Sequence, residues 1–103
     1  MKPIGTHNYY VYILTNSFRT VLYVGVTNNL SRRLNEHKED STGPKKSFAG
    51  KYKCFFLIYW ERFQYIQHAI AREKEIKGWS RKKKEDLIAT FNPSWRFLNS
   101  EVE

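Results

Sequence analysis

The segment 9–38 constrains the fold of this chain more than any other part of its sequence. Tyr9–Thr15 and Val21–Thr27 are rich in aromatic and β-branched residues, which is typical of β-strands. Asn16–Thr20 between them has the length of a hairpin loop and contains the turn formers Asn and Ser. The second run also contains Gly25, where a backbone or a ligand can approach closely. The segment therefore predicts a β-hairpin.

A helix is expected to follow the hairpin directly. Asn28-Asn29 offers an N-cap, and Leu30 and Leu34 begin an apolar stripe with helical spacing. Arg33 and His37 lie four residues apart, so they share one face of this helix.

The strand pattern brings polar aromatic groups to that helix. Side chains alternate along a strand, so Tyr10 and Tyr12 share one face while Val11 and Ile13 take the other. Tyr23 lies on the pairing strand. Two phenols, a guanidinium and an imidazole can therefore converge over the hairpin, and this set of groups is typical of a site that handles phosphate.

The charge of the chain favours a polyanionic partner. Its 103 residues suffice for one domain with a modest core, and they carry a formal net charge of +8 with a sequence pI of about 9.7. A basic domain of this size usually binds nucleic acid. The competing interpretation is a basic ribosomal or membrane-surface protein.

Cys54 is the only cysteine, which excludes an intramolecular disulfide and a cysteine-built zinc site and fits a reducing cytoplasm. It precedes the apolar run Phe55–Ile58 and is expected to be a small buried hydrophobe. Residues 1–8 lack the apolar core of a signal peptide and are expected to form a flexible leader, and no stretch is long enough to span a bilayer. We expect a cytoplasmic protein with no membrane partner.

The periodicity stops between Lys38 and Lys53, where turn residues predict a long loop. Loops of this length are often functional or mobile. Its lysines either clamp a phosphate backbone or only solubilise the loop; they are Lys45, Lys46, Lys51 and Lys53.

Cys54–Arg62 is expected to be a third strand. Its apolar run does not alternate, which indicates burial on both faces and hence a central strand covered by helices.

Gln64–Lys77 has the apolar spacing of a second helix, and Gly78 is expected to end it in a left-handed conformation. Glu73 lies on the apolar stripe, where a carboxylate is seldom buried unless it is paired or bound to a metal. Two interpretations stay open: an ion pair with Arg33 or another basic neighbour, or ligation of a hard divalent cation such as Mg²⁺.

Ser80 is expected to cap a third helix that runs to about Thr90. Its first turns carry cations, which oppose the helix dipole: Arg81, Lys82, Lys83 and Lys84. Either they bind phosphates through counterion release, or they form a solvated face.

Together these elements predict a small α/β (α+β) domain over residues 9–95. It contains a central three-stranded, largely antiparallel sheet with three helices packed around it. Residues 96–103 are expected to form a C-terminal tail.

The segment 9–38 resembles the GIY-YIG nuclease superfamily. Tyr10-Val11-Tyr12 stands in the place of the first signature triplet, and Tyr23-Val24-Gly25 stands in the place of the second. The interval between the two signature tyrosines is the usual one in that family, and so is the interval from Gly25 to Arg33.

His37 and Glu73 extend the set of matching residues beyond the two triplets and Arg33, and the resemblance covers about residues 9–95. The chain is most similar to the short, single-domain bacterial members of the family. Two positions depart from the family pattern. Tyr10 stands where the family name has glycine, and Val26 stands where the excision-repair members carry a lysine.

The resemblance implies a nuclease that uses one Mg²⁺ or Mn²⁺ ion. In the family, one glutamate on the second helix holds the cation, which implies this role for Glu73, with Glu75 as the alternative if the register differs by two. Family members also place an asparagine near the site, which implies Asn92; a simple C-cap beside Pro93 is the other interpretation of that residue.

The predicted function is a metal-dependent DNA endonuclease of low sequence specificity, acting on branched or damaged DNA or together with another protein. Arg33 would contact the scissile phosphate, and Tyr12 or Tyr23 would act as the base or orient the water. His37 would bind phosphate or relay protons, unless it is structural. The residues predicted to lie against nucleic acid are Gly25, Lys45, Lys46, Arg81, Lys82 and Lys83. The alternatives are a nucleic-acid-binding module without catalysis and a ribosome- or partner-associated structural domain.

Overall fold

The computed structural model describes residues 8–40, 42–43 and 48–102, and it has an α+β fold. Its strands are β1 (Tyr9–Thr15), β2 (Leu22–Thr27) and β3 (Phe56–Phe63), and its helices are α1 (Leu30–Asp40), α2 (Phe48–Lys51), α3 (Ile66–Lys77), α4 (Arg81–Phe91) and α5 (Asn99–Val102). The predicted hairpin, third strand and three longer helices are confirmed. The single-turn helices α2 and α5 are additions that the sequence pattern did not indicate.

The three strands form one antiparallel sheet in the order β2-β1-β3. The central strand is therefore β1, and the expectation that the third strand would be central was wrong. The apolar run of β3 does not alternate because both of its faces are covered, although one of its edges pairs with no strand among the described residues. The tail binds that edge instead: the Leu98 amide donates to the Leu57 carbonyl, and the Leu57 amide donates to Asn99 Oδ1.

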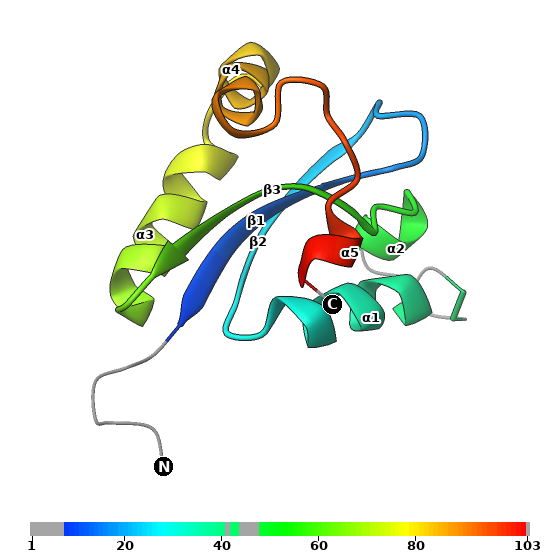
Figure 1. Ribbon diagram of the computed structural model, residues 1–103, viewed down its shortest axis with the longest axis horizontal. Coiled ribbons are helices and arrows are strands. Elements are labelled where there is room, and N and C mark those ends of the chain that lie inside the picture. Colours follow the sequence, from blue (N-terminus) through cyan, green and yellow to red (C-terminus); the bar gives the residue numbers. More distant parts are fainter. Residues whose placement is uncertain (1–7, 41, 44–47, 103) are drawn as a thin grey trace.

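The sheet separates two apolar clusters, as the alternation along β1 predicted. Val11 and Ile13 pack with Ile76 of α3 and Ile88 of α4. Tyr12 and Leu14, together with Tyr10, lie on the opposite face with residues of α1, α2 and α5. Figure 1 shows α3 and α4 on one side of the twisted sheet and α1, α2 and α5 on the other.

The passage from α3 to α4 corrects the expectation for Gly78. Its φ is −78°, which lies in the right-handed region and not in the left-handed one. The Gly78 amide still bonds to the carbonyls of Lys74 and Glu75. Two residues follow before α4 begins, and Gly78 itself does not adopt a left-handed conformation. The predicted cap at Ser80 is confirmed, because its hydroxyl accepts a hydrogen bond of 3.2 Å from the Lys83 amide.

Two other sequence expectations concern buried groups. Cys54 is a buried free thiol, as predicted, and burial raises its pKa to about 11. Leu98, within the segment expected to be a tail, is buried among the residues of the α1 face. Residues 96–102 therefore pack on the domain. None of the helices that the structure describes is long and apolar enough to cross a bilayer.

Asn92 ends α4, and its side chain joins three segments. Nδ2 donates to the carbonyls of Ile58 at 3.0 Å and Arg96 at 2.8 Å, and Oδ1 accepts from the Arg96 amide at 3.0 Å. The structure thus supports the capping interpretation of Asn92, because its amide already binds β3 and the tail.

We predict that Asn92→Ala lowers the free energy of unfolding by about 2–3 kcal/mol, because it leaves two backbone carbonyls and one amide without partners in a buried place. Urea denaturation followed by circular dichroism measures the change. Asn35→Ala, on the exposed face of α1, is the matched control and is expected to have little effect. Equal stabilities of the two variants would contradict this role for Asn92.

Candidate active site

Four of the predicted site residues meet on the α1 face of the sheet. Tyr12 comes from the middle of β1, Tyr23 from β2, and Arg33 and His37 from consecutive turns of α1. We call these residues the tyrosine cluster. The local sequence explains the arrangement, because the predicted cap forms: Asn29 Oδ1 accepts from the Arg32 amide at 3.0 Å and starts α1 just beyond the hairpin.

A chain of hydrogen bonds runs through the tyrosine cluster. Arg33 Nε lies 3.3 Å from Tyr12 Oη, and Tyr12 Oη lies 2.9 Å from His37 Nε2. A guanidinium N–H can only donate, so the Tyr12 oxygen accepts from it. The phenolic proton is then directed at His37 Nε2, which assigns a neutral imidazole with its proton on Nδ1.

Ring contacts complete the tyrosine cluster. The centroid of Tyr23 lies 5.1 Å from that of His37 and 6.3 Å from that of Tyr12, and the rings of Tyr12 and His37 are 5.8 Å apart. Tyr12 and His37 are 1 % and 2 % exposed, whereas Tyr23 is only half-buried. Of the two tyrosines, only Tyr23 is therefore partly exposed to solvent.

Gly25 makes room for this arrangement. It pairs with Tyr12 across β1 and β2, and a Cβ at position 25 would lie 2.4 Å from Tyr12 Oη and 2.5 Å from its Cζ. The predicted close approach at Gly25 is thus real, but the group that approaches is Tyr12. Gly25 lies beneath the phenol instead of presenting an open backbone surface.

Burial sets the protonation states of the tyrosine cluster. It raises the pKa of Tyr12 to about 12, against the opposing hydrogen bond from Arg33. Burial, and secondly the charge of Arg33, lower the pKa of His37 to about 4. Burial alone would lower the pKa of Arg33, but its bonds to Tyr12 and Glu36 raise it above its ordinary value. At neutral pH the cluster therefore holds one cation, a neutral imidazole and a protonated Tyr12.

Arg33 keeps part of its guanidinium open. Nε binds Tyr12, and Nη1 pairs with Glu36 at 3.2 Å. Within the described residues Nη2 makes no hydrogen bond, and the side chain is 39 % exposed. Glu36 was not predicted as a site residue, although its position three residues after Arg33 on a helix was a usable signal. The cluster thus offers one fixed, partly exposed cation beside a half-buried phenol.

Glu73 does not join the tyrosine cluster. It lies on α3, across the sheet, where it is 8 % exposed and its Oε1 pairs with Lys77 Nζ at 2.7 Å. The structure therefore contains the ion pair that the sequence left open, with Lys77 in place of Arg33. Among the described residues no three His, Cys, Asp or Glu side chains gather as a metal site.

A single carboxylate such as Glu73 nevertheless suits a Mg²⁺ ion, because this ion usually keeps several waters and takes further oxygens from a substrate phosphate. The donor set fits one ion held mainly by water and substrate. It does not fit a cage built by the protein.

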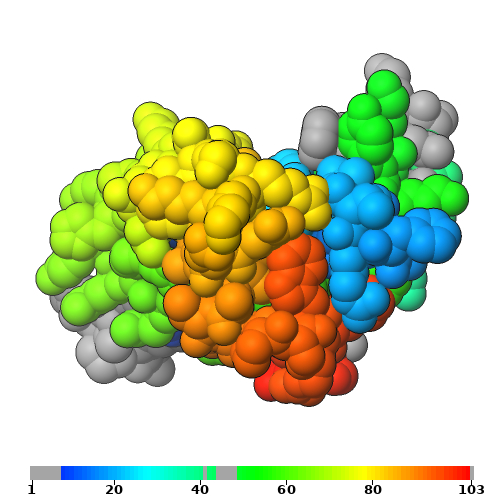
Figure 2. Space-filling view, turned by 90° about the horizontal axis from the view of Figure 1, so that it is seen from above, coloured from blue at the N-terminus to red at the C-terminus, as the bar shows by residue number. Residues whose placement is uncertain are grey.

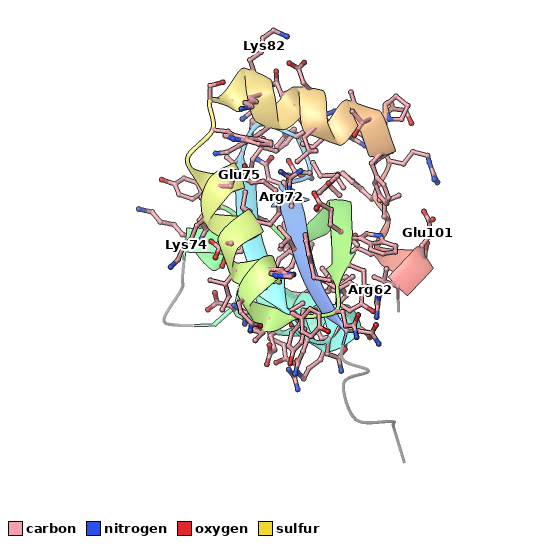
Figure 3. All side chains as sticks on the ribbon, turned by 90° about the vertical axis from the view of Figure 1, so that its left-hand side faces the viewer. Arg62, Arg72, Lys74, Glu75, Lys82 and Glu101 are labelled. Atoms are coloured by element: carbon pink, nitrogen blue, oxygen red, sulfur yellow. The ribbon has the colours of Figure 1, made fainter. Side chains whose placement is uncertain are left out.

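Arg81, Lys82 and Lys83 at the start of α4 have local partners. Arg81 donates to the carbonyls of Thr20 at 2.6 Å and Arg19 at 3.2 Å, which ties α4 to the β1–β2 loop; Figure 2 shows the two segments side by side. Lys82 pairs with Asp86 at 3.1 Å and projects away from the body of the protein (Figure 3).

Lys83 lies 4.3 Å from the centroid of the Trp79 ring. The structure therefore places none of these three α4 cations in the tyrosine cluster. Lys45 and Lys46 lie outside the described residues.

Stability is expected to depend on His37. Its pKa is about 4 in the folded chain and near 6.5 when unperturbed, so the unfolded chain binds more protons between these values. The stability from burying neutral His37 is therefore complete above pH 6.5 and is lost as the pH falls from 6.5 to 4.

We predict that Arg33→Gln raises the pKa of His37, because it removes a nearby cation.

Imidazole signals followed by NMR across this pH range measure the pKa of His37. Arg32→Gln removes the neighbouring, exposed guanidinium, which bonds to Asn28, and serves as the control with no expected change. A His37 that titrates above pH 6 in the unchanged protein would contradict the assigned neutral state.

We predict that Gly25→Ala destabilises the protein by about 1–3 kcal/mol, because the new methyl group must displace the Tyr12 ring in a packed interior. Urea denaturation measures the loss, and the His37 signals report whether its contact with Tyr12 survives. Gly78→Ala is the control, since a Cβ there meets only backbone atoms at 3.5 Å or more. A Gly25→Ala protein as stable as the control would show that Tyr12 has room to move.

Comparison with known proteins gives a consistent assignment. The model of the GIY-YIG catalytic domain matches residues 8–86. A UPF0213 protein of Natronomonas pharaonis is 39 % identical over 82 residues, which is 80 % of this chain and 92 % of that relative. A UPF0213 protein of Syntrophus aciditrophicus is 37 % identical over 79 residues, 77 % of this chain and 87 % of the relative.

A solved structure agrees with these matches. The solution NMR structure of a UPF0213 protein from Bacillus halodurans has a TM-score of 0.52 and 28 % identity, covering 85 % of this chain and 89 % of that one. The matched region contains the whole tyrosine cluster and Glu73. The chain belongs to the GIY-YIG family, and its relatives there are the UPF0213 proteins.

Proposed function

We propose that this protein is a divalent-metal-dependent endonuclease that hydrolyses phosphodiesters in DNA. The family places it among nuclease-type hydrolases. The observation that carries the proposal is the open Nη2 of Arg33, held beside the half-buried phenol of Tyr23 by the bond from Arg33 Nε to Tyr12. A fixed guanidinium of this kind binds a phosphate and stabilises the charge that develops on it.

The two phenols then have different roles. Tyr12 is buried with a pKa of about 12, so it is a poor base near neutral pH, and it holds Arg33 in place. Tyr23 is the phenol that a substrate can reach. We assign to Tyr23 the role of orienting or deprotonating the attacking water. His37 is neutral and accepts from Tyr12, so it acts as a positioning residue and does not donate a proton to the leaving group.

Glu73 is the residue that would hold one Mg²⁺ or Mn²⁺ ion. The bound ion would neutralise charge on the phosphate and stabilise the leaving oxygen. Only Oε1 of Glu73 pairs with Lys77, so the ion could bind Oε2 while the pair persists, or it could displace the Lys77 ammonium toward the DNA backbone. Branched or damaged DNA is the substrate class we propose. Contact of Arg81, Lys82 and Lys83 with its backbone stays a prediction, as does that of Lys45 and Lys46, which lie outside the described residues.

The Glu73–Lys77 pair favours a second candidate function, a nucleic-acid-binding module without catalysis. A carboxylate that is already neutralised at 2.7 Å has no need of a cation. Such a module would use the same guanidinium and the same positive charge, and it would bind DNA equally well in the presence of a chelator.

The deciding experiment is cleavage of labelled duplex, flap, fork and single-stranded DNA with Mg²⁺, Mn²⁺ or chelator. We predict metal-dependent cutting that falls by about 10²–10³-fold in Arg33→Ala, the effect of removing one preorganised donor. A comparable loss is expected in Glu73→Gln.

Two matched controls accompany these variants. Arg32→Ala removes an exposed guanidinium from the same helix, and Glu75→Gln removes an exposed carboxylate that pairs with Arg72 on α3 (Figure 3). Both are expected to keep most of the activity. Binding without cutting in either metal, unchanged in Glu73→Gln, would refute the nuclease and support the binding module.

A further inference from the structure

A cavity of about 460 Å³ lies at the start of α1, beside the tyrosine cluster. Its lining includes the aromatic rings of Tyr10 and Trp60, which meet edge to face with centroids 5.9 Å apart. Both rings are half-buried and contribute to the wall. Cavities of several hundred Å³ with aromatic walls are typical of sites for small organic groups.

Polar groups of the cavity are partly unused. Asn28 and Asn29 bind Arg32 through their side-chain oxygens, so within the described residues their Nδ2 groups keep both N–H donors. The hydroxyl of Ser31 also makes no hydrogen bond there. The cavity therefore presents amide donors and a hydroxyl next to two aromatic rings.

Glu101 of α5 supplies a carboxylate to the same cavity; Figure 3 shows it at the edge of the fold. It pairs with Arg96 at 3.3 Å, and both groups are more than half exposed. A carboxylate disfavours a phosphate at this place, although the first turn of α1 would by itself attract an anion. It instead accepts from an amino group, as glutamate does from the exocyclic amine of cytosine.

The cavity adjoins the proposed phosphate site along two elements. Tyr10 lies two residues before Tyr12 on the same face of β1, a separation of about 7 Å. Asn29 lies one helical turn before Arg33, whose amide bonds to its carbonyl. Trp60 pairs directly with Tyr12 across β1 and β3. A group in the cavity is thus about one nucleotide unit from a phosphate on Arg33.

We propose that this cavity is a nucleobase subsite, which receives one unstacked base next to the phosphate bound by Arg33. One of the two rings stacks against the base and the other, which meets it edge to face, contacts the edge of the base. The amides of Asn28 and Asn29 donate to the acceptors of the base, and Glu101 accepts from its amino group. A paired base inside a duplex cannot enter such a cavity. The subsite therefore selects substrates whose strand is unpaired at the cleaved position. This inference rests on the proposed function for the phosphate neighbour, but the base-binding property does not require cleavage.

The first test is an NMR titration of the isotope-labelled protein with deoxycytidine or deoxyadenosine, and with deoxyribose as the control that lacks a base. We expect saturable shifts at Tyr10, Asn29 and the Trp60 indole N–H with the nucleosides and none with deoxyribose. Absence of shifts at these positions with both nucleosides would overturn the inference. No metal or cleavage is involved.

The second test measures binding of a fluorescent single-stranded oligonucleotide and of an abasic strand of equal length, both in chelator. We expect the protein to bind the base-bearing strand about tenfold more tightly, as stacking of one base on an aromatic side chain provides. Tyr10→Ala should bring this ratio close to one. Ser31→Trp, which fills the cavity without removing a wall, should do the same and guards against a folding defect in the first variant.

Phe18→Ala is the control, because Phe18 is 83 % exposed on the β1–β2 loop and does not line the cavity. It should keep the ratio. A ratio near one in the unchanged protein, with cleavage intact, would overturn the subsite and leave the nuclease standing. The opposite result is a tenfold ratio in the unchanged protein, a ratio near one in Tyr10→Ala and Ser31→Trp, and no cleavage of any DNA. It would support the subsite and refute the nuclease.

Discussion

The tyrosine cluster depends on one buried hydroxyl group. Tyr12 Oη accepts from Arg33 and donates to His37, and so it connects the central strand to two turns of α1. A phenol at this depth needs both partners, since an unsatisfied hydroxyl would be costly. It also needs Gly25, whose missing side chain leaves the space for the ring. The same hydroxyl group therefore holds the Arg33 guanidinium and the His37 imidazole, and the ring that carries it leaves no space for a side chain at position 25.

The sequence predicted the structure best where the position of a side chain follows directly from the period of its strand or helix. Alternation along β1 separated the tyrosines from Val11 and Ile13, and helical spacing put Arg33 and His37 on one face of α1, which meets Tyr12; both expectations hold. The position of β3 could not be predicted in the same way, because burial of both faces does not reveal what lies at an edge. The edge is bound by Asn99, a residue more than forty positions away in the chain. The cavity at Tyr10 was missed for a similar reason, since its walls come from four segments that are distant in the sequence.

The Glu73 carboxylate shows why a local pattern can support opposite functions. A charge in an apolar stripe indicated that something must compensate it, and Lys77 one turn later does so at 2.7 Å. The spacing of four residues between Glu73 and Lys77 is visible in the sequence. It does not predict the pair, because a long flexible ammonium can either pair within its own helix or reach toward solvent. Lys77 therefore compensates the Glu73 carboxylate within the helix, and a cation that replaced it would have to bind Glu73 more favourably than the ammonium does.

The tail along β3 has a consequence for the behaviour of the protein in concentrated solution. An outer strand with several aromatic residues is a template for pairing with another chain, and natural proteins cover or blunt such edges. Here the Leu98 amide and the Asn99 amide group occupy backbone positions near Leu57 that a strand from a second molecule would use. Leu98 and the start of α5 thus cover this edge against pairing with a second molecule. The same helix places Glu101 in the lining of the nearby cavity.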